Sequence, residues 1–250
     1  MPLSPQDLDR HKRHLLLKEI GGPGLQKLKS ASVAIVGAGA LGGPCALYLA
    51  AAGVGTLTIV DDDRVERSNL QRQVQFSEAD VGRPKTERLA ARLVALDSDL
   101  TVRAEAKRFA DGDRLDGDIL VDATDNFPTR FALNALAHRT GRPLVSGAAQ
   151  GWQGQVSVFA SGIDPSAPCY RCLVPEEPPR AASCETDGVV GAVTGMIGAA
   201  MALEVVKLVT GAGESLKGRL WIVDGLEHHS RTVSLQRDPA CQVCATASFL

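Results

Sequence analysis

Aromatic residues are scarce in this chain, because phenylalanine, tryptophan and tyrosine together make up only 4% of its 250 residues. The core must therefore be filled mainly by alanine, valine and leucine, and a hydrophobic content of 44% is enough for a sizeable one. Strong charge of either sign is also missing, since the formal net charge is −2. A balanced charge excludes a global attraction to nucleic acid or to an anionic membrane, so neither is expected as a partner.

The sequence also lacks segments that would direct it into or across a membrane. The opening MPLSPQDLDRHKRH is polar and charged and contains no apolar core of a signal peptide. No run of about 18 apolar residues is free of charge, and the most apolar stretch carries Glu204 and Lys207, so no membrane span is expected. A cytoplasmic location follows, and in that reducing compartment paired cysteines more often bind metal or do chemistry than form structural disulfides.

Closely spaced glycines follow a short apolar run in the segment VAIVGAGALGG, residues 33–43. Gly37, Gly39 and Gly42 match the pattern G-x-G-x-x-G between a predicted strand and a predicted helix. The first glycine permits a tight turn, the second lets the backbone approach a phosphate, and the third lets the helix pack on the sheet. Asp61 follows about 20 residues later, at the end of the next predicted strand, where a carboxylate can accept hydrogen bonds from ribose hydroxyls. The segment therefore predicts a nucleotide-binding strand–helix–strand unit.

The glycine turn alone does not distinguish NAD from ATP, but the charged residues after it do. Arg72 lies in SNLQRQ, Lys85 in GRPK and Asp125 in DATDN, which ends a later predicted strand. The carboxyl ends of parallel strands meet at the ligand edge of such a sheet, so we expect these side chains to lie close together. Cations and a carboxylate suit a triphosphate with Mg²⁺, whereas hydride transfer needs a mostly uncharged nicotinamide pocket. Because the chain lacks the P-loop pattern G-x-x-x-x-G-K-[ST], these side chains must take the place of a P-loop.

The order of the patterns predicts an α/β fold. Strand and helix patterns alternate through the first half, which is typical of a Rossmann-like, doubly wound, mainly parallel sheet. A ribbon of strands, a long loop, a long apolar helix and two antiparallel strands follow. Near the start, a basic helix over residues 8–17 is broken by the following GGPG. We expect an N-terminal helical arm (1–30), a nucleotide-binding half (31–147) and a second half (148–250), within one continuous domain.

Four of the six cysteines form two C-x-x-C pairs, Cys169 with Cys172 and Cys241 with Cys244. Two such pairs far apart in sequence can close one tetrahedral Zn²⁺ site, and a closed shell of four thiolates leaves no position for substrate. We therefore predict a structural zinc site that ties the C-terminal tail to the loop around Cys169. The alternative, a redox pair, lacks thioredoxin-like surroundings.

The other two cysteines differ in their surroundings. Cys45 lies in the helix after the glycine turn and is predicted to be a small core residue. Cys184 stands alone in the loop RAASCETDG, so it is either a candidate nucleophile or a tolerated loop thiol.

Taken together, these motifs resemble the E1-like (ThiF/MoeB/HesA) adenylyltransferases, the bacterial relatives of ubiquitin-activating enzymes. The resemblance covers nearly the whole chain and is carried by RHKRHLLL, GAGALGG, SNLQRQ, GRPK, DATDN, GQVSVF, CYRC, CETDGVVG and CQVC. It implies an enzyme that binds ATP with Mg²⁺ and adenylates the C-terminal Gly-Gly carboxylate of a ubiquitin-like sulfur-carrier protein. Pyrophosphate leaves, and the acyl-adenylate then receives sulfur to give a thiocarboxylate, for molybdopterin, thiamine thiazole or related synthesis.

The resemblance also assigns roles to residues. It implies that Asp61 binds the ribose and that Asp125 organises Mg²⁺. It also implies that Asn69, Arg72 and Lys85 hold the phosphates. The whole nucleotide site that it implies is Gly37, Gly39, Ala40, Gly42, Asp61, Asp63, Ser68, Asn69, Leu70, Gln71, Arg72, Lys85, Asp125 and Asn126. Ala40 is a departure, because some members have a third closely spaced glycine there. Its methyl group should be tolerated but could alter how the backbone approaches the triphosphate.

Two further positions and the partners follow from the resemblance. Arg13 matches an arginine that the family supplies from the neighbouring subunit, which implies a homodimer with composite sites. Cys184 matches a loop cysteine that bonds covalently to the carrier in some members and is dispensable in others. The second half of the chain would bind the carrier. No rhodanese-like sequence follows Leu250, so a separate sulfur donor, a cysteine desulfurase or a rhodanese, is expected.

No histidine is assigned a catalytic role. A carboxylate is already ionised at pH 7, so adenylation needs no general base, and the five histidines are expected at the surface or in packing. Two other functions stay open at this point. One is an NAD-dependent oxidoreductase, which calorimetry with each nucleotide would separate from an adenylating enzyme. The other is a non-catalytic relative that docks a carrier without turnover, and the presence of Arg72, Lys85 and Asp125 argues against it.

Overall fold

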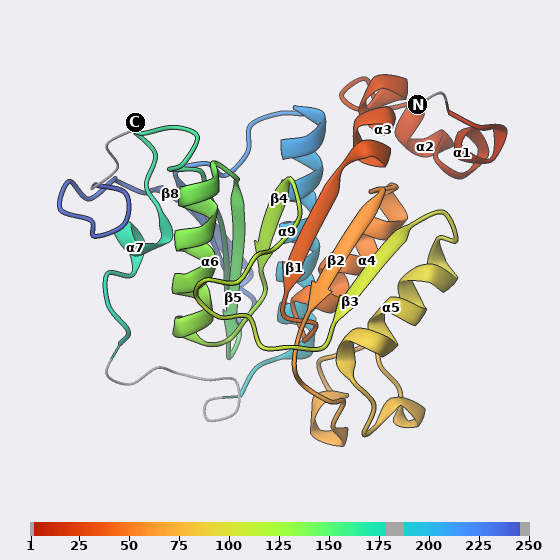
Figure 1. Ribbon diagram of the computed structural model, residues 1–250, viewed down its shortest axis with the longest axis horizontal. Coiled ribbons are helices and arrows are strands. Elements are labelled where there is room, and N and C mark those ends of the chain that lie inside the picture. Colours follow the sequence, from red (N-terminus) through yellow and green to blue (C-terminus); the bar gives the residue numbers. More distant parts are fainter. Residues whose placement is uncertain (1–2, 179–187, 246–250) are drawn as a thin grey trace.

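The computed structural model describes residues 3–178 and 188–245 of the chain. Its strands form a single sheet between two layers of helices (Figure 1). The strands are β1 (Ser32–Val36), β2 (Thr56–Val60), β3 (Thr101–Glu105), β4 (Ile119–Asp122), β5 (Leu144–Gln150), β6 (Gln153–Phe159), β7 (Arg219–Asp224) and β8 (His229–Ser234). The helices are α1 (Pro5–Arg10), α2 (Lys12–Leu15), α3 (Gly21–Ser30), α4 (Gly42–Ala52), α5 (Lys85–Leu96), α6 (Phe127–Thr140), α7 (Tyr170–Leu173) and α9 (Gly191–Thr210), with short 3₁₀ turns η1 (Arg67–Asn69) and η2 (Glu78–Asp80).

The sheet has the order β3-β2-β1-β4-β5-β6-β7-β8. The first five strands of this order pair in parallel, and β6, β7 and β8 continue the sheet in antiparallel pairing. The predicted α/β fold, with a mainly parallel sheet that continues into an antiparallel C-terminal part, is confirmed. Because the parallel strands point the same way, the turns after β1, β2 and β4 lie at one edge, which we call the carboxyl edge.

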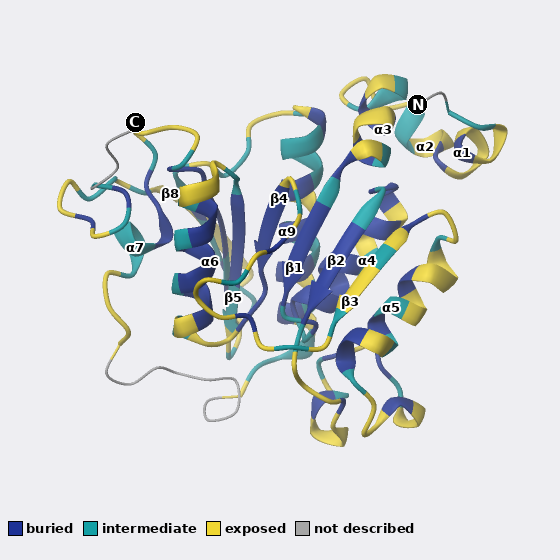
Figure 2. Ribbon diagram, in the orientation of Figure 1, coloured by how far each residue is buried: buried dark blue, intermediate teal, exposed yellow. Residues whose placement is uncertain are grey.

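Residues of the central parallel strands alternate between two cores. In β1, Val33 and Ile35 pack in the cluster that holds side chains of α4, α5 and α9. Ala34 and Val36 pack instead in the cluster that holds side chains of α6. Burial on both faces is typical of a doubly wound sheet, and Figure 2 shows β1 and β4 dark along most of their length. Packing between the two helical layers therefore fixes the strands, and with them the places where the turns of the carboxyl edge begin.

Helix α9 is long and apolar enough, by length and composition, to cross a membrane. In this fold it packs against α4, β5 and β6, and its Ile197 and Met201 are fully buried. Its Glu204 is buried as well, and the carboxylate accepts hydrogen bonds from Lys207 Nζ and from Leu216 N, both at 2.6 Å. The helix is thus a core element of this fold, and its one buried acid is fully paired.

The N-terminal arm differs from the prediction of one helix over residues 8–17. Two short helices, α1 and α2, take its place and are separated at His11. The following GGPG does not break a helix but forms the first turn of α3. Proline is tolerated there because N–H groups in a first turn have no partner within the helix. An ion pair between the buried Asp7 and Lys29 fastens α1 to α3.

Low pH should destabilise the protein through His11, which lies in this arm. His11 is buried with its ring stacked 5.6 Å from that of His14, and burial, together with the charges of His14 and Arg10, lowers the pKa of His11. A lowered pKa means that the native state resists protonation. The free energy of unfolding should therefore fall as the pH drops below the unfolded-state value of about 6.5, by at most ~1.4 kcal/mol per pH unit from this group.

Urea unfolding at about pH 7.5 and about pH 5.5 measures this loss. The variant His11→Gln should lose less stability between the two pH values than the unmodified chain. His138→Gln is a comparison variant outside the arm. Burial also lowers the pKa of His138, so this variant, too, should lose less stability between the two pH values than the unmodified chain. An unchanged pH dependence in His11→Gln would contradict the assignment.

Candidate nucleotide site and cysteine cluster

The glycine turn joins β1 to α4 at the carboxyl edge. Gly37 has a φ of +98°, and a Cβ there would lie 2.5 Å from Ala123 O, while a Cβ on Gly42 would lie 1.7 Å from Gly37 O. A side chain at either position would therefore collide with backbone. At Gly39 the nearest atom to such a Cβ would be Gln73 Nε2 at 3.5 Å, which is an ordinary contact. The fold itself requires Gly37 and Gly42, whereas the bare backbone at Gly39 leaves room beside the turn for a ligand.

Asp61, directly after β2, faces this turn. Its Oδ2 accepts a hydrogen bond from Ala38 N at 2.6 Å, and its Oδ1 accepts one from Asp63 N at 2.8 Å. Burial raises the pKa of Asp61, while these N–H groups and Lys85 act in the opposite direction. Each carboxylate oxygen keeps a lone pair beyond these bonds, so Asp61 can still accept hydrogen bonds from a ligand hydroxyl.

Lys85 begins α5 at the same edge. Its side chain is 7% exposed, and Nζ lies 2.7 Å from Oδ2 of Asp63, whose side chain is 59% exposed. An ammonium group has three N–H donors, and the Asp63 carboxylate uses one of them here. The Asp63 carboxylate is exposed, whereas the Lys85 ammonium group is buried. An incoming anion can therefore bind Lys85 together with Asp63 or take the place of Asp63.

The segment SNLQRQVQF runs beside the glycine turn. Gln75 is buried, and its Nε2 donates to both Ala38 O and Gly39 O at 3.0 Å, which holds the turn in shape. Arg72 is half-buried and donates from Nη1 to Ser68 O at 3.1 Å. The other predicted residues of this segment, Ser68, Asn69, Leu70 and Gln71, lie in η1 and in the turn that follows it. The role of Gln75 could not be predicted, because a glutamine in a loop carries no signal of its own.

Two aspartates near the end of β4 differ in burial, since Asp122 lies in the core and Asp125 at the surface. Asp122 is fully buried, and its carboxylate accepts hydrogen bonds from Thr124 Oγ1 and Ser146 Oγ, both at 2.7 Å. Arg130 of α6 lies 3.4 Å from the same carboxylate and donates to Thr124 O. Asp125 is exposed and forms no hydrogen bond with another residue in the described part of the chain. A buried network thus fixes the backbone before Asp125 and leaves its carboxylate open to solvent at the edge.

The structure gathers most of the predicted nucleotide-site residues at the carboxyl edge. Those on the turns after β1, β2 and β4 and on the start of α5 are Gly37, Gly39, Ala40, Gly42, Asp61, Asp63, Lys85, Asp125 and Asn126. Arg13 is not among them. It is exposed on α2, beyond the opposite ends of the strands (Figure 1), so a single chain does not bring it to this edge. Cys184 lies outside the described residues.

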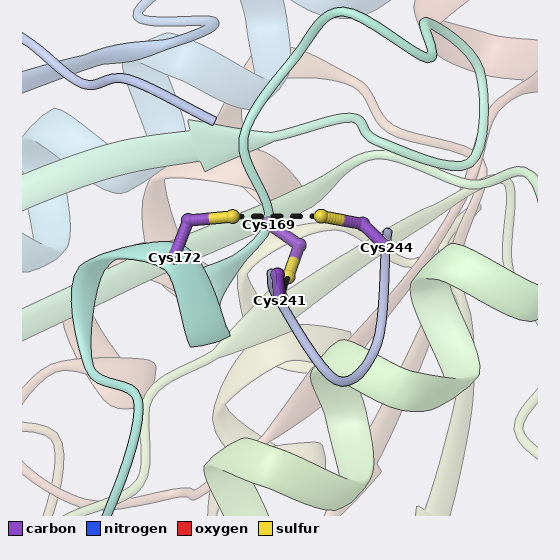
Figure 3. A group of neighbouring side chains, drawn as sticks. All are labelled: Cys169, Cys172, Cys241 and Cys244. Atoms are coloured by element: carbon purple, nitrogen blue, oxygen red, sulfur yellow. Dashed lines mark hydrogen bonds between the residues drawn. The ribbon is translucent and has the colours of Figure 1, made fainter. Parts of the chain in front are cut away.

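The two C-x-x-C pairs come together in a second cluster, shown in Figure 3. Sγ of Cys169 lies 3.5 Å from that of Cys241, Sγ of Cys172 lies 3.4 Å from that of Cys244, and all four sulfurs are within 4.8 Å of one another. A tetrahedral zinc ion with bonds of about 2.3 Å would need sulfurs about 3.8 Å apart. Burial raises the pKa of Cys169, whereas N–H groups of Cys244 and Val243 outweigh burial at Cys241 and lower its pKa to about 7.

These distances fit a tetrahedral thiolate site, as predicted. Cys169, Cys241 and Cys244 are buried and Cys172 is half-buried. A metal held by all four would be enclosed, with no open position for a substrate. Such a site is typical of a structural metal rather than a catalytic one. The remaining described cysteine, Cys45, is a fully buried core residue as predicted, and burial raises the pKa of its thiol to about 12.

Comparison with known proteins assigns the chain to a family, since residues 11–243 match the model of the ThiF family. The chain belongs to the ThiF family. This ThiF chain is 44% identical over 250 residues to a protein named SAMP-activating enzyme E1 from Haloferax volcanii, covering 98% of this chain and 91% of that protein. It is 43% identical over 252 residues to a protein named sulfur carrier protein adenylyltransferase from Thermus thermophilus, covering 98% and 93%.

Another ThiF relative and two solved structures extend the comparison. A protein named adenylyltransferase and sulfurtransferase MOCS3 from Caenorhabditis briggsae is 42% identical, and the match covers 97% of this chain and 61% of that longer protein. The structure of E. coli MccB with ATP has a TM-score of 0.80 at 23% identity, covering 98% of this chain and 82% of that one. The structure of MccB in complex with N-formylated MccA has a TM-score of 0.83 at 24% identity, covering 97% and 77%. At this identity the likeness shows the fold.

Proposed function

We propose that this ThiF chain uses ATP to adenylate the C-terminal carboxylate of a small ubiquitin-like sulfur-carrier protein that ends in Gly-Gly. The names of its relatives from Haloferax volcanii and Thermus thermophilus support this function, since the matches span nearly the full length of both proteins. The observation that carries it is the arrangement at the carboxyl edge. An open backbone at Gly39, the buried cation of Lys85 and the exposed carboxylate of Asp125 all lie along this edge, which suits a metal-bound polyanion.

The proposed reaction needs positioning and charge neutralisation more than proton transfer. An oxygen of the carrier carboxylate forms a bond to the α-phosphorus, and the bond from that phosphorus to the oxygen bridging to the β-phosphate breaks, which releases pyrophosphate. Both reactants are anions, so Lys85 and Arg72 lower the barrier by binding the phosphate oxygens. Asp61 accepts hydrogen bonds from the ribose and orients the nucleotide. Asp125 would hold Mg²⁺, which supplies further positive charge when bound.

A carrier-dependent exchange of labelled pyrophosphate into ATP tests this proposal. Exchange that requires ATP, Mg²⁺ and a carrier with an intact Gly-Gly terminus is the expected result. Tight NAD binding without binding of ATP with Mg²⁺ would favour an oxidoreductase instead. Carrier binding without exchange, for every carrier of the host, would favour a docking protein without turnover.

Arg13 belongs to this proposal as a residue supplied by a second copy of the chain. It lies far from the carboxyl edge of its own chain, and its neighbours Leu16 and Leu17 have exposed fractions of 76% and 48%. These adjacent leucines offer apolar surface that a second subunit could cover. In a homodimer, the arm of one subunit would carry Arg13 into the nucleotide site of the other.

Mixing two inactive variants checks the composite site. Arg13→Ala and Lys85→Met should each lose exchange activity. In a mixed dimer, one site would receive an intact Arg13 from the Lys85→Met subunit and an intact Lys85 from the other, so up to about a quarter of the sites in a random mixture should recover. A mixture with no more activity than its components, under conditions where subunits exchange, would contradict a shared site.

Sulfur transfer would follow adenylation. A nucleophilic sulfur from a separate donor, of the cysteine desulfurase or rhodanese class, attacks the acyl carbon, and AMP leaves. Cys184 lies outside the described residues, and its covalent role stays a prediction. Loss of sulfur transfer with intact adenylation in Cys184→Ala would support it.

A further inference from the structure

Helix α6 and its N-cap residue carry a row of polar residues, of which the two middle members are buried, the last is half-buried and the first is exposed. The row consists of every fourth residue: Asn126, Arg130, Asn134 and His138. At the carboxyl edge, Asn126 caps the helix by accepting a hydrogen bond from Thr129 N at 3.0 Å. At the far end, His138 Nδ1 lies 3.0 Å from Ser161 Oγ. Residues at this spacing lie on one helix face, so the row runs from the nucleotide site towards the cysteine cluster.

Asn134 is the member of this row that touches the cysteine cluster. Its exposed fraction is 1%, its Nδ2 donates to Cys169 Sγ at 3.6 Å, and its Oδ1 accepts a hydrogen bond from Tyr170 N at 2.8 Å. The second bond fixes the orientation of the amide. A backbone N–H can only donate, so it must face Oδ1, and the NH₂ group must then face the sulfur.

We propose that Asn134 is a positioning residue of the cysteine cluster, whose amide N–H orients the Cys169 sulfur and stabilises it as a thiolate ligand. A thiolate in a buried site needs hydrogen-bond donors to replace water, and Cys169 has an exposed fraction of 0%. The metal ion would be held by the four cysteines, and the amide would act from outside that shell. Loss of such outer partners typically weakens metal binding about 10–100-fold.

Two substitutions at Asn134 remove either one or both of its hydrogen bonds. Asn134→Asp keeps an oxygen for Tyr170 N but replaces the N–H donor by an anion against the sulfur, so it should weaken metal binding about 100-fold, at the upper end of this range. Asn134→Leu removes both bonds at similar volume and should weaken binding about 10-fold. Thr129→Val is the matched control on the same helix, since Thr129 is buried but bonds to Phe109 O rather than to a cysteine.

The experiment loads the full chain with Co²⁺ and titrates it with a competing chelator, without ATP or carrier. The thiolate-to-cobalt absorption bands report the cluster directly, so the result does not depend on adenylation. We expect Thr129→Val to match the unmodified chain, and both Asn134 variants to bind more weakly, with faster release. Equal affinity and release rates in all four proteins would overturn the proposal.

A measurement on the unmodified chain covers the case in which an Asn134 variant fails to fold. In protein loaded with ¹¹³Cd²⁺, a side-chain amide proton of Asn134 should show a scalar coupling to the metal through Cys169 Sγ, because the N–H···S bond links the two. The second amide proton, which does not face the sulfur, is the internal control. An amide group with neither coupling nor a chemical-shift change on metal loading would overturn the proposal.

Discussion

Asp125→Ala should reduce carrier-dependent pyrophosphate exchange by a factor of about 10² to 10³ or more, while leaving the fold intact. The carboxylate is exposed and forms no hydrogen bond with the described residues, so its loss should cost little stability. Its proposed role is to hold Mg²⁺ on the triphosphate. The buried Asp122 is already committed to Arg130 and cannot substitute.

The control for Asp125→Ala is Asp99→Ala. Asp99 is also exposed, but it lies before β3, at the opposite edge of the sheet. It should keep full exchange activity and the same melting temperature as Asp125→Ala. Retained exchange in Asp125→Ala at saturating Mg²⁺ would refute the assigned role, whereas a melting temperature lowered only in Asp125→Ala would point to a structural role.

The second large effect is expected at the cysteine cluster. Cys241→Ser should lower the metal content measured by mass spectrometry from about one ion per chain to none. It should also lower the free energy of unfolding by several kcal/mol. Cys169 and Cys241 are 72 residues apart, and a cross-link that closes a loop of this length stabilises a fold by about 4 kcal/mol in the chain-entropy model of disulfides. Thermal unfolding with and without a chelator should show the same loss.

Cys45→Ala is the matched control for this prediction. Cys45 is buried in the core, away from the cluster, so its variant should keep the metal and lose only packing. A chelator should then lower the melting temperature of Cys45→Ala and of the unmodified chain, but not that of Cys241→Ser. Full metal content in Cys241→Ser, or equal stability with and without metal, would contradict a structural zinc site.

Much of this fold could be predicted because its signals are local. The strand before Gly37, the helix after Gly42 and the C-x-x-C pairs each occupy a few consecutive residues, and their chemistry follows from spacing alone. The boundaries of the N-terminal arm could not be predicted in this way. Proline and glycine in GGPG break a helix or begin one equally well, and packing against α2 and α9 decides between the two.

The supporting residues of the site could not be predicted from the sequence either. Gln75 matters only because the fold places it against Ala38 O and Gly39 O, and Arg130 because the fold places it under Thr124 O. Their partners lie far along the chain or across a turn. The row on α6 did have a periodic signal, since polar residues recur every fourth position from Asn126. This spacing predicts that Arg130 and Asn134 share one helix face, but it does not predict which partners the fold brings to them.

The continuous sheet also limits how this molecule can move. The predicted boundary between residues 31–147 and 148–250 falls inside β5, which pairs with β4 on one side and with β6 along seven residues on the other, from Leu144↔Phe159 to Gln150↔Gln153. A hinge at this boundary would have to bend β5 and break its pairing with its neighbours, which argues against rigid-body closure of one half over the other as a way to seal a bound nucleotide. Any rearrangement that accompanies turnover must be confined to the connections at the edges of the sheet.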